Sequence, residues 1–192
     1  MSSLDIRPLA SPEEASECAR MMAVSEPWVT LERGYEESLA LLQDATREVY
    51  GAFDQGRVLG FVILNMSGAF VGYIQTICVG EEDRSRGIGT RLMRFAEERI
   101  FRESPNVFLC VSSFNPRAKA LYERLGYEAV GELNDYIVRG HSEHIFRKTI
   151  GPIREFRKGK KPFCHPEERS DEGSAPGSSE KRTRADPSLR SG

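Results

Sequence analysis

Two arginines and two glycines lie close together in Arg84-Ser85-Arg86-Gly87-Ile88-Gly89. The apolar run 74–79 before this segment has the length and β-branched composition of a strand. After the segment, apolar residues recur at helical spacing up to Ile100. The glycines therefore lie where a helix begins, and the first N–H groups of a helix have no partner within it. Together with the helix dipole and the arginines, these N–H groups predict an anion site suited to a pyrophosphate, which glycine allows to approach the backbone closely.

Two other phosphate-binding patterns differ from this segment. The P-loop requires Gly-Lys-Ser/Thr, and the sequence contains no such tripeptide. The dinucleotide fingerprint requires a third glycine, but Thr90, Arg91 and Leu92 follow Gly89.

A second segment with unusual composition runs from residue 115 to residue 127. Asn115-Pro116 is typical of a helix start, since Asn caps the first N–H groups and Pro suits the first helical position. Gly126 is typical of the position after a helix end. We therefore expect a short helix here, with Tyr122 on its apolar side.

The elements around these segments alternate in a defined order. We expect strands at 4–9, 48–53, 58–65, 70–79, 107–111, 127–131 and 145–150, and helices from 11, from about 35, over 88–100 and over 116–125. The three hairpin-linked strands before the central helix should pair antiparallel, and the strand-helix-strand order over 70–111 predicts a parallel pair. The prediction is an α+β fold, with a mixed sheet of about six to seven strands and helices on both faces. We expect residues 1–151 to form one domain, and the charged composition of residues 152–192 predicts a disordered tail.

Both segments resemble the GCN5-related N-acetyltransferase (GNAT) family. Arg-x-x-Gly-x-Gly after a strand ending in Val79 resembles its acyl-CoA pyrophosphate loop, and the segment 115–127 resembles its last conserved block. The resemblance implies an enzyme that transfers acetyl from acetyl-CoA to a primary amine of a small molecule or protein by direct attack. An acyl-CoA-binding regulatory module without turnover is the alternative.

The resemblance also implies roles for individual residues. Tyr122 would protonate the leaving thiolate, although a packing role in the core is the alternative. Asn115 would contact the cofactor, cap the helix, or do both. The implied cofactor-binding residues are Ile77, Cys78, Val79, Arg84, Ser85, Arg86, Gly87, Ile88, Gly89, Thr90 and Asn115.

The positions of the general base in two branches of the family are occupied by other residues. Protein N-terminal acetyltransferases tend to carry Glu five positions before the Asn, where this chain has Cys110. Histone acetyltransferases carry Glu on the strand before the pyrophosphate loop, where this chain has Tyr73. Glu143, Tyr136 and Asp135 remain as candidates, and we take Glu143 as the catalytic residue.

Composition limits the other classes of function. The net charge of −2 argues against nucleic acid as the main partner. The longest apolar run, 58–64, is too short to cross a membrane and no signal-peptide pattern is present, so we expect a cytoplasmic monomer or homodimer. The four cysteines lack metal-ligand spacing, and His141 and His144 would point to opposite faces of a strand, so no metal is expected.

Overall fold

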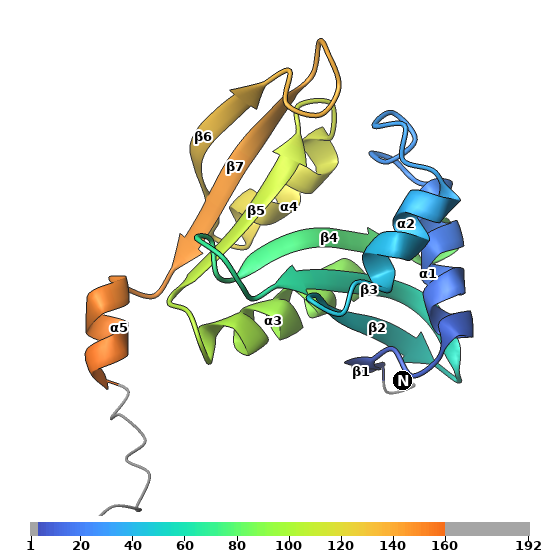
Figure 1. Ribbon diagram of the computed structural model, residues 1–192, viewed down its shortest axis with the longest axis horizontal. Helices are drawn as coiled ribbons and strands as arrows, with labels where there is room; N and C mark the ends of the chain where they lie inside the picture. The colour runs from blue at the N-terminus through green and yellow to red at the C-terminus, as the bar shows by residue number, and fades with distance from the viewer. Residues whose placement is uncertain (1–3, 160–192) are drawn as a thin grey trace, which may run out of the picture. The chain divides into compact units, whose positions relative to one another are not determined.

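A seven-stranded mixed sheet organises residues 4–159, the part of the chain that the structure, a computed structural model, describes (Figure 1). The strand order is β1-β2-β3-β4-β5-β7-β6, and only β4 and β5 pair in parallel. The expected α+β fold is confirmed. The strands are β1 (Asp5–Pro8), β2 (Glu48–Asp54), β3 (Arg57–Asn65), β4 (Tyr73–Val79), β5 (Asn106–Ser112), β6 (Glu128–Asn134) and β7 (Ser142–Thr149).

Helices cover both faces of the sheet (Figure 1). One face packs against α1 and α2 through a core that includes Met22 and Phe61, and the other packs against α3 and α4 through a core that includes Leu92 and Phe146. None of the helices in residues 4–159 is long and apolar enough to cross a membrane. The helices are α1 (Pro12–Ala23), α2 (Tyr35–Leu42), α3 (Ile88–Phe101), α4 (Pro116–Arg124) and α5 (Ile153–Gly159).

The element boundaries differ from the sequence prediction at three places. The strand expected from residue 70 begins at Tyr73, because Gly72 has a φ of 90° and turns the chain. The last two strands extend towards each other and leave only residues 135–141 as the loop between them. The tail expected from residue 152 begins with α5, and its remainder, residues 160–192, lies outside the described residues.

A β-bulge in β4 opens the middle of the sheet. On the β3 side, Thr76 pairs with Ile63 and Ile74 pairs with Leu64, so Gln75 is an extra residue in β4. A bulge bends its strand and increases the local twist. On the other side, β4 and β5 pair at only two positions, Tyr73 with Phe108 and Ile74 with Leu109. Beyond the bulge the two strands separate.

Candidate active site

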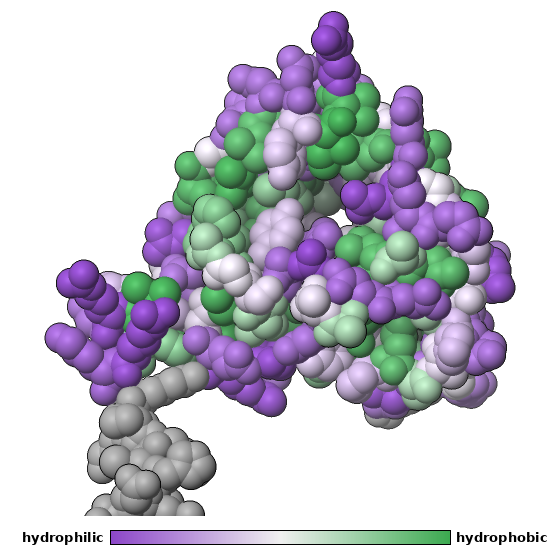
Figure 2. Space-filling view, viewed as in Figure 1, coloured by the Kyte–Doolittle hydropathy of each residue, from purple (hydrophilic) through white to green (hydrophobic). Residues whose placement is uncertain are grey.

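A cleft of about 1090 Å³ occupies the opening between β4 and β5. Its walls also include the start of α3, one side of α4, the segment 26–33 after α1, and the β6–β7 loop. Figure 2 shows the surface hollowed between the part that carries β6 and β7 and the part that carries α1 and α2. The cleft thus reaches both faces of the sheet through the gap that the bulge creates.

Backbone N–H groups of β4 point into this gap. The Gly80 N–H donates to the Leu59 carbonyl at 2.9 Å, and this pair continues the antiparallel register of β3 and β4. Hydrogen bonding alternates along such a ladder, so Cys78 bonds to β3 while Ile77 and Val79 direct their N–H groups away from it. Both of these N–H groups face the cleft beyond the last β4–β5 pair. Of the three β4 residues predicted to bind the cofactor, Ile77 and Val79 direct their N–H groups into the cleft, whereas Cys78 directs its N–H group to β3.

The first turn of α3 is open to the cleft. Gly87 caps the helix with a φ of 80° and provides no side-chain hydrogen bond to its first N–H groups. A Cβ on Gly87 would meet no atom within 4 Å, and a Cβ on Gly89 would lie 3.8 Å from Val79 Cγ2. The space above the helix start is therefore free, and Ile88 and Thr90 lie within the same turn. The first N–H groups of α3, which begins at Ile88, have no partner within the helix and can bind an anion.

Arg84 and Arg86, the two arginines of the predicted pyrophosphate loop, bind other groups of the protein and so stabilise the loop. Arg84 donates through Nε to the Val79 carbonyl at 3.2 Å and through a terminal nitrogen to Ser25 Oγ at 3.2 Å. Arg86 pairs with the buried Asp83, which also receives a bidentate pair from Arg57 at 2.8 and 2.9 Å. The hydrogen bond from Arg57 is the main cause that lowers the pKa of Asp83. This carboxylate therefore holds the loop while it stays ionised.

Arg117 brings a further positive charge to the loop from α4. Its guanidinium donates to Ser85 Oγ at 2.9 Å, and both residues line the cleft. Sequence reasoning missed Arg117, although its place two residues after the cap Asn115 was a signal that it lies at a helix start. Asn115 Oδ1 accepts from the Ala118 N–H at 3.1 Å, which confirms its capping role, and Asn115 also lines the cleft.

Tyr122 lies in the core and at the cleft wall. Its side chain is 6% exposed and packs against Tyr127 and Phe146, with ring centroids 6.0 and 6.3 Å away. Burial raises the pKa of Tyr122 to about 12. Burial alone accounts for this shift of the Tyr122 pKa, with no contribution from a hydrogen bond, and the residue lines the cleft.

A second polar cluster lies on the opposite face of the sheet. Leu109 and Val111 pack into the core shared with α3 and α4, so the alternating side chains of Cys110 and Ser112 project from the other face. Ser112 Oγ donates to Glu143 Oε1 at 2.5 Å, and the two residues are direct partners in the β5–β7 register. We missed Ser112 because the sequence alone does not reveal this long-range pairing.

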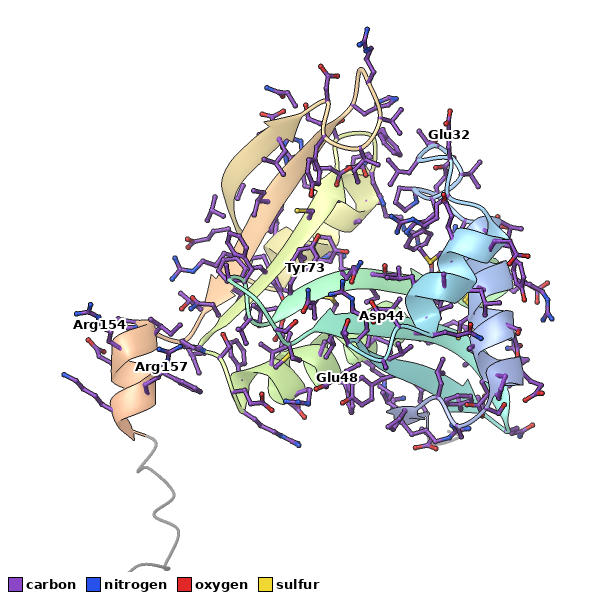
Figure 3. The ribbon with its side chains drawn as sticks, viewed as in Figure 1. Glu32, Asp44, Glu48, Tyr73, Arg154 and Arg157 are labelled. Carbon is purple, nitrogen blue, oxygen red and sulfur yellow. The ribbon has the colours of Figure 1, made fainter. Side chains whose placement is uncertain are left out.

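Burial sets the protonation tendencies of this cluster. Glu143 is 5% exposed, and burial raises the pKa of its carboxyl group, while the Ser112 hydrogen bond acts in the opposite direction. Burial also raises the pKa values of Tyr73, which lies where β4 and β5 begin to separate (Figure 3), and of Cys110. The thiol and phenol therefore stay neutral, and Glu143 is the group of this cluster suited to accept a proton.

The sequence matches the family model of the acetyltransferase (GNAT) family over residues 13–127. The chain belongs to the GNAT family. A search of curated proteins gave no match.

Solved structures with the GNAT fold resemble this one closely in architecture. An aminoglycoside 6'-N-acetyltransferase complexed with coenzyme A is 20% identical, with a TM-score of 0.63 over 77% of this chain and 98% of that chain. The ribosomal-protein-S18-alanine N-acetyltransferase from Escherichia coli is 18% identical, with a TM-score of 0.61 over 78% and 96%. The aminoglycoside 6'-N-acetyltransferase from Enterococcus faecium is 21% identical, with a TM-score of 0.60 over 77% and 98%. At these identities the likeness establishes the fold.

The other predicted bases of this GNAT protein lie at different depths. Asp135 accepts from the Gly140 N–H at 2.6 Å and closes the β6–β7 loop. Tyr136 is 64% exposed at the cleft rim. His141 packs against the Phe114 ring at 4.8 Å, and no group of three or more His, Cys, Asp or Glu side chains in residues 4–159 could hold a metal ion. Glu143 is thus the one of the three candidate bases that is buried within the cleft.

Proposed function

We propose that this GNAT protein is an acetyl-CoA-dependent N-acetyltransferase whose acceptor is a primary amine. One observation carries the proposal: the β4–β5 opening joins the open start of α3 on one face of the sheet to a buried carboxylate on the other. The complex of a fold relative with coenzyme A supports the cofactor, and the aminoglycoside and S18-alanine acceptors of fold relatives support an amine.

The residues on the α4 side fit the pyrophosphate and the pantetheine arm. The free space above Gly87 and Gly89 accommodates an anion against the first N–H groups of α3, and Arg117 adds positive charge. Bound acetyl-CoA supplies the acetyl thioester. The N–H groups of Ile77 and Val79 donate hydrogen bonds within the opening, and such fixed donors need no reorganisation as charge develops on a carbonyl oxygen.

The proton leaves the amine on the other face of the sheet. A lysine-like amine has a pKa near ~10.4 and must lose a proton before it attacks. Glu143 accepts that proton, because it is the buried carboxylate of the cluster and its pKa is raised towards the working range of a base.

Tyr122 acts on the leaving sulfur. The pKa of Tyr122, about 12, exceeds the pKa of a typical thiol, ~8.5. Each unit of this pKa difference corresponds to about 1.4 kcal/mol of proton-transfer free energy. Complete proton transfer to a thiolate is therefore uphill. Its hydroxyl instead donates a hydrogen bond that stabilises the thiolate as it forms.

Release of free thiol from acetyl-CoA in the presence of an amine panel tests the proposed activity. We expect amine-dependent thiol release and an acetylated amine detectable by mass spectrometry. Tight binding of CoA without thiol release for any amine would instead support the regulatory module.

The variant Gly89→Val tests the cofactor site. The added side chain would occupy the free space over the α3 amides, so we expect CoA to bind at least about tenfold more weakly, a loss of about 1.4 kcal/mol. The melting temperature without ligand should change little, because Val is a better helix former than Gly. Isothermal titration with CoA measures the effect.

Gly131→Val is the matched control for Gly89→Val. Gly131 lies on the exposed strand β6, outside the cleft, where a Cβ would lie 3.6 Å from Ile145 Cδ1. This variant should bind CoA like the parent. Equal affinities of the two variants for CoA would overturn the assignment of the pyrophosphate site.

A further inference from the structure

The half of the cleft on the Glu143 side carries few charges that could bind a cationic acceptor. Its titratable acids are Glu143 and Glu26, since Asp83 is paired with arginines in the loop at the other end. Glu26 is exposed. Its carboxylate accepts a hydrogen bond from the Thr30 N–H at 3.3 Å and another from the Thr30 hydroxyl at 3.1 Å. Glu143 is therefore the one buried carboxylate in the walls of this half, as far as residues 4–159 show.

Besides the exposed Glu26, this half carries a positive charge. Arg33, in the segment after α1, lines the cleft. Its positive charge would repel a polycation. An acceptor with several ammonium groups would find one buried carboxylate, Glu143, and its other ammonium groups would lie beside Arg33, against neutral walls or near the solvent-exposed Glu26. Removing such charges from water without a partner is costly.

Two segments contribute apolar and aromatic side chains to the cleft that contains Glu143. On one side lie Trp28, which is 7% exposed, and Leu31. On the other lie Tyr136 and Ile137 of the β6–β7 loop, which are 64% and 45% exposed. Two large apolar side chains that stay exposed at the rim of a cleft gain burial when an apolar ligand covers them.

We propose that the acceptor is a hydrophobic monoamine: one primary amine, which meets Glu143, on an apolar or aromatic body, which lies between the segment 27–31 and the β6–β7 loop. This inference rests on the proposed function and narrows its substrate class. It separates this protein from polycationic acceptors such as an aminoglycoside, although fold relatives act on aminoglycosides.

Competing acceptors test the inference in the full-length protein. 2-Phenylethylamine and a peptide amide beginning with Met-Leu represent the hydrophobic monoamine as a small molecule and as a chain terminus. Spermidine and kanamycin represent polycations. We expect kcat/KM to be at least about tenfold higher for one of the monoamines than for either polycation, within the range that apolar pocket contacts supply. The better monoamine then identifies the source of the acceptor.

A charge at the rim should change this preference. In Ile137→Glu, we expect kcat/KM for the better monoamine to fall at least about tenfold and the ratio of spermidine to monoamine to rise. Val130→Glu is the matched control, because Val130 is 53% exposed on the same hairpin and lies outside the cleft. It should keep the parent's ratio.

The outcomes distinguish this inference from the proposed function. Faster acetylation of kanamycin or spermidine than of both monoamines would overturn the hydrophobic acceptor and leave the acetyltransferase standing. An unchanged ratio in Ile137→Glu would overturn the role of the rim. Absence of acetyl transfer to all four acceptors, with no binding of CoA, would overturn the proposed function itself.

Discussion

Replacement of Glu143 by Gln is expected to lower kcat by roughly 10²–10⁴-fold, the range for loss of a general base. Gln keeps the size of the side chain and can still accept from Ser112 Oγ, but it cannot take a proton from the amine. The KM for acetyl-CoA should change little, because Glu143 lies on the face of the sheet opposite α4. Steady-state thiol release measures both constants. Glu132→Gln, on the neighbouring strand and outside the cleft, should retain full activity.

The pH profile gives a second readout for Glu143. Its pKa is raised by burial, so the acid limb of kcat/KM should lie above the ordinary range of a glutamate, near ~4.3, and should disappear in Glu143→Gln. An identical acid limb in parent and variant would assign the base to another group.

The raised pKa of Glu143 also makes the stability of the fold depend on pH. Because the pKa is raised in the folded state, the unfolded chain loses this proton first as pH rises. The folded protein then binds more protons than the unfolded one, and stability falls until pH passes the folded pKa. The gain in melting temperature from Glu143→Gln should therefore be larger at about pH 8 than at about pH 4. A gain that is equal at both pH values would mean that Glu143 is not destabilised when ionised.

Replacement of Tyr122 by Phe is expected to lower kcat by roughly 10²–10³-fold, as for the loss of one donor to a developing anion. The ring and its contacts with Tyr127 and Phe146 remain, so the melting temperature should stay near that of the parent. The KM for acetyl-CoA should also stay close, because the hydrogen bond strengthens only as the thiolate develops. Rapid-quench measurement of a single turnover isolates this step.

Tyr127→Phe is the control for Tyr122→Phe. Tyr127 packs against Tyr122 in the same core but does not line the cleft. Loss of its hydroxyl should leave kcat near the parent's value. Similar losses of kcat in the two variants would show that the core, rather than the Tyr122 hydroxyl, determines the rate.

Local sequence signals predicted the parts of the site that local structure determines. Gly87 and Asn115 begin α3 and α4 as expected, since glycine conformation and side-chain capping act over a few residues. The parallel β4–β5 pair followed from the order of elements along the chain, whereas the position of β7 between β5 and β6 was not predicted.

Local sequence signals could not predict the contacts between segments that are distant in the sequence. The bulge at Gln75 depends on the register of β4 against β3, and the Ser112–Glu143 pair depends on the register of β5 against β7. The arginines of the loop were predicted to bind phosphate, and their contacts within the protein were not predicted: Arg84 donates to the Val79 carbonyl and Ser25 Oγ, and Arg86 pairs with Asp83. Residue type indicated their charge, and only the folded loop shows where that charge is already paired.

The bulge also gives an interior strand the hydrogen-exchange behaviour of an edge strand. Within β4, the amide proton of Cys78 is bonded to β3, whereas those of Ile77 and Val79 face the opening. In the free protein we expect the Cys78 amide to exchange slowly with deuterium and its two neighbours to exchange much faster. Acetyl-CoA should slow the exchange of Ile77 and Val79 while leaving Cys78 nearly unchanged. Three consecutive amides, followed by NMR, would thus show whether the bound cofactor takes the place of the strand that β4 lacks on this side.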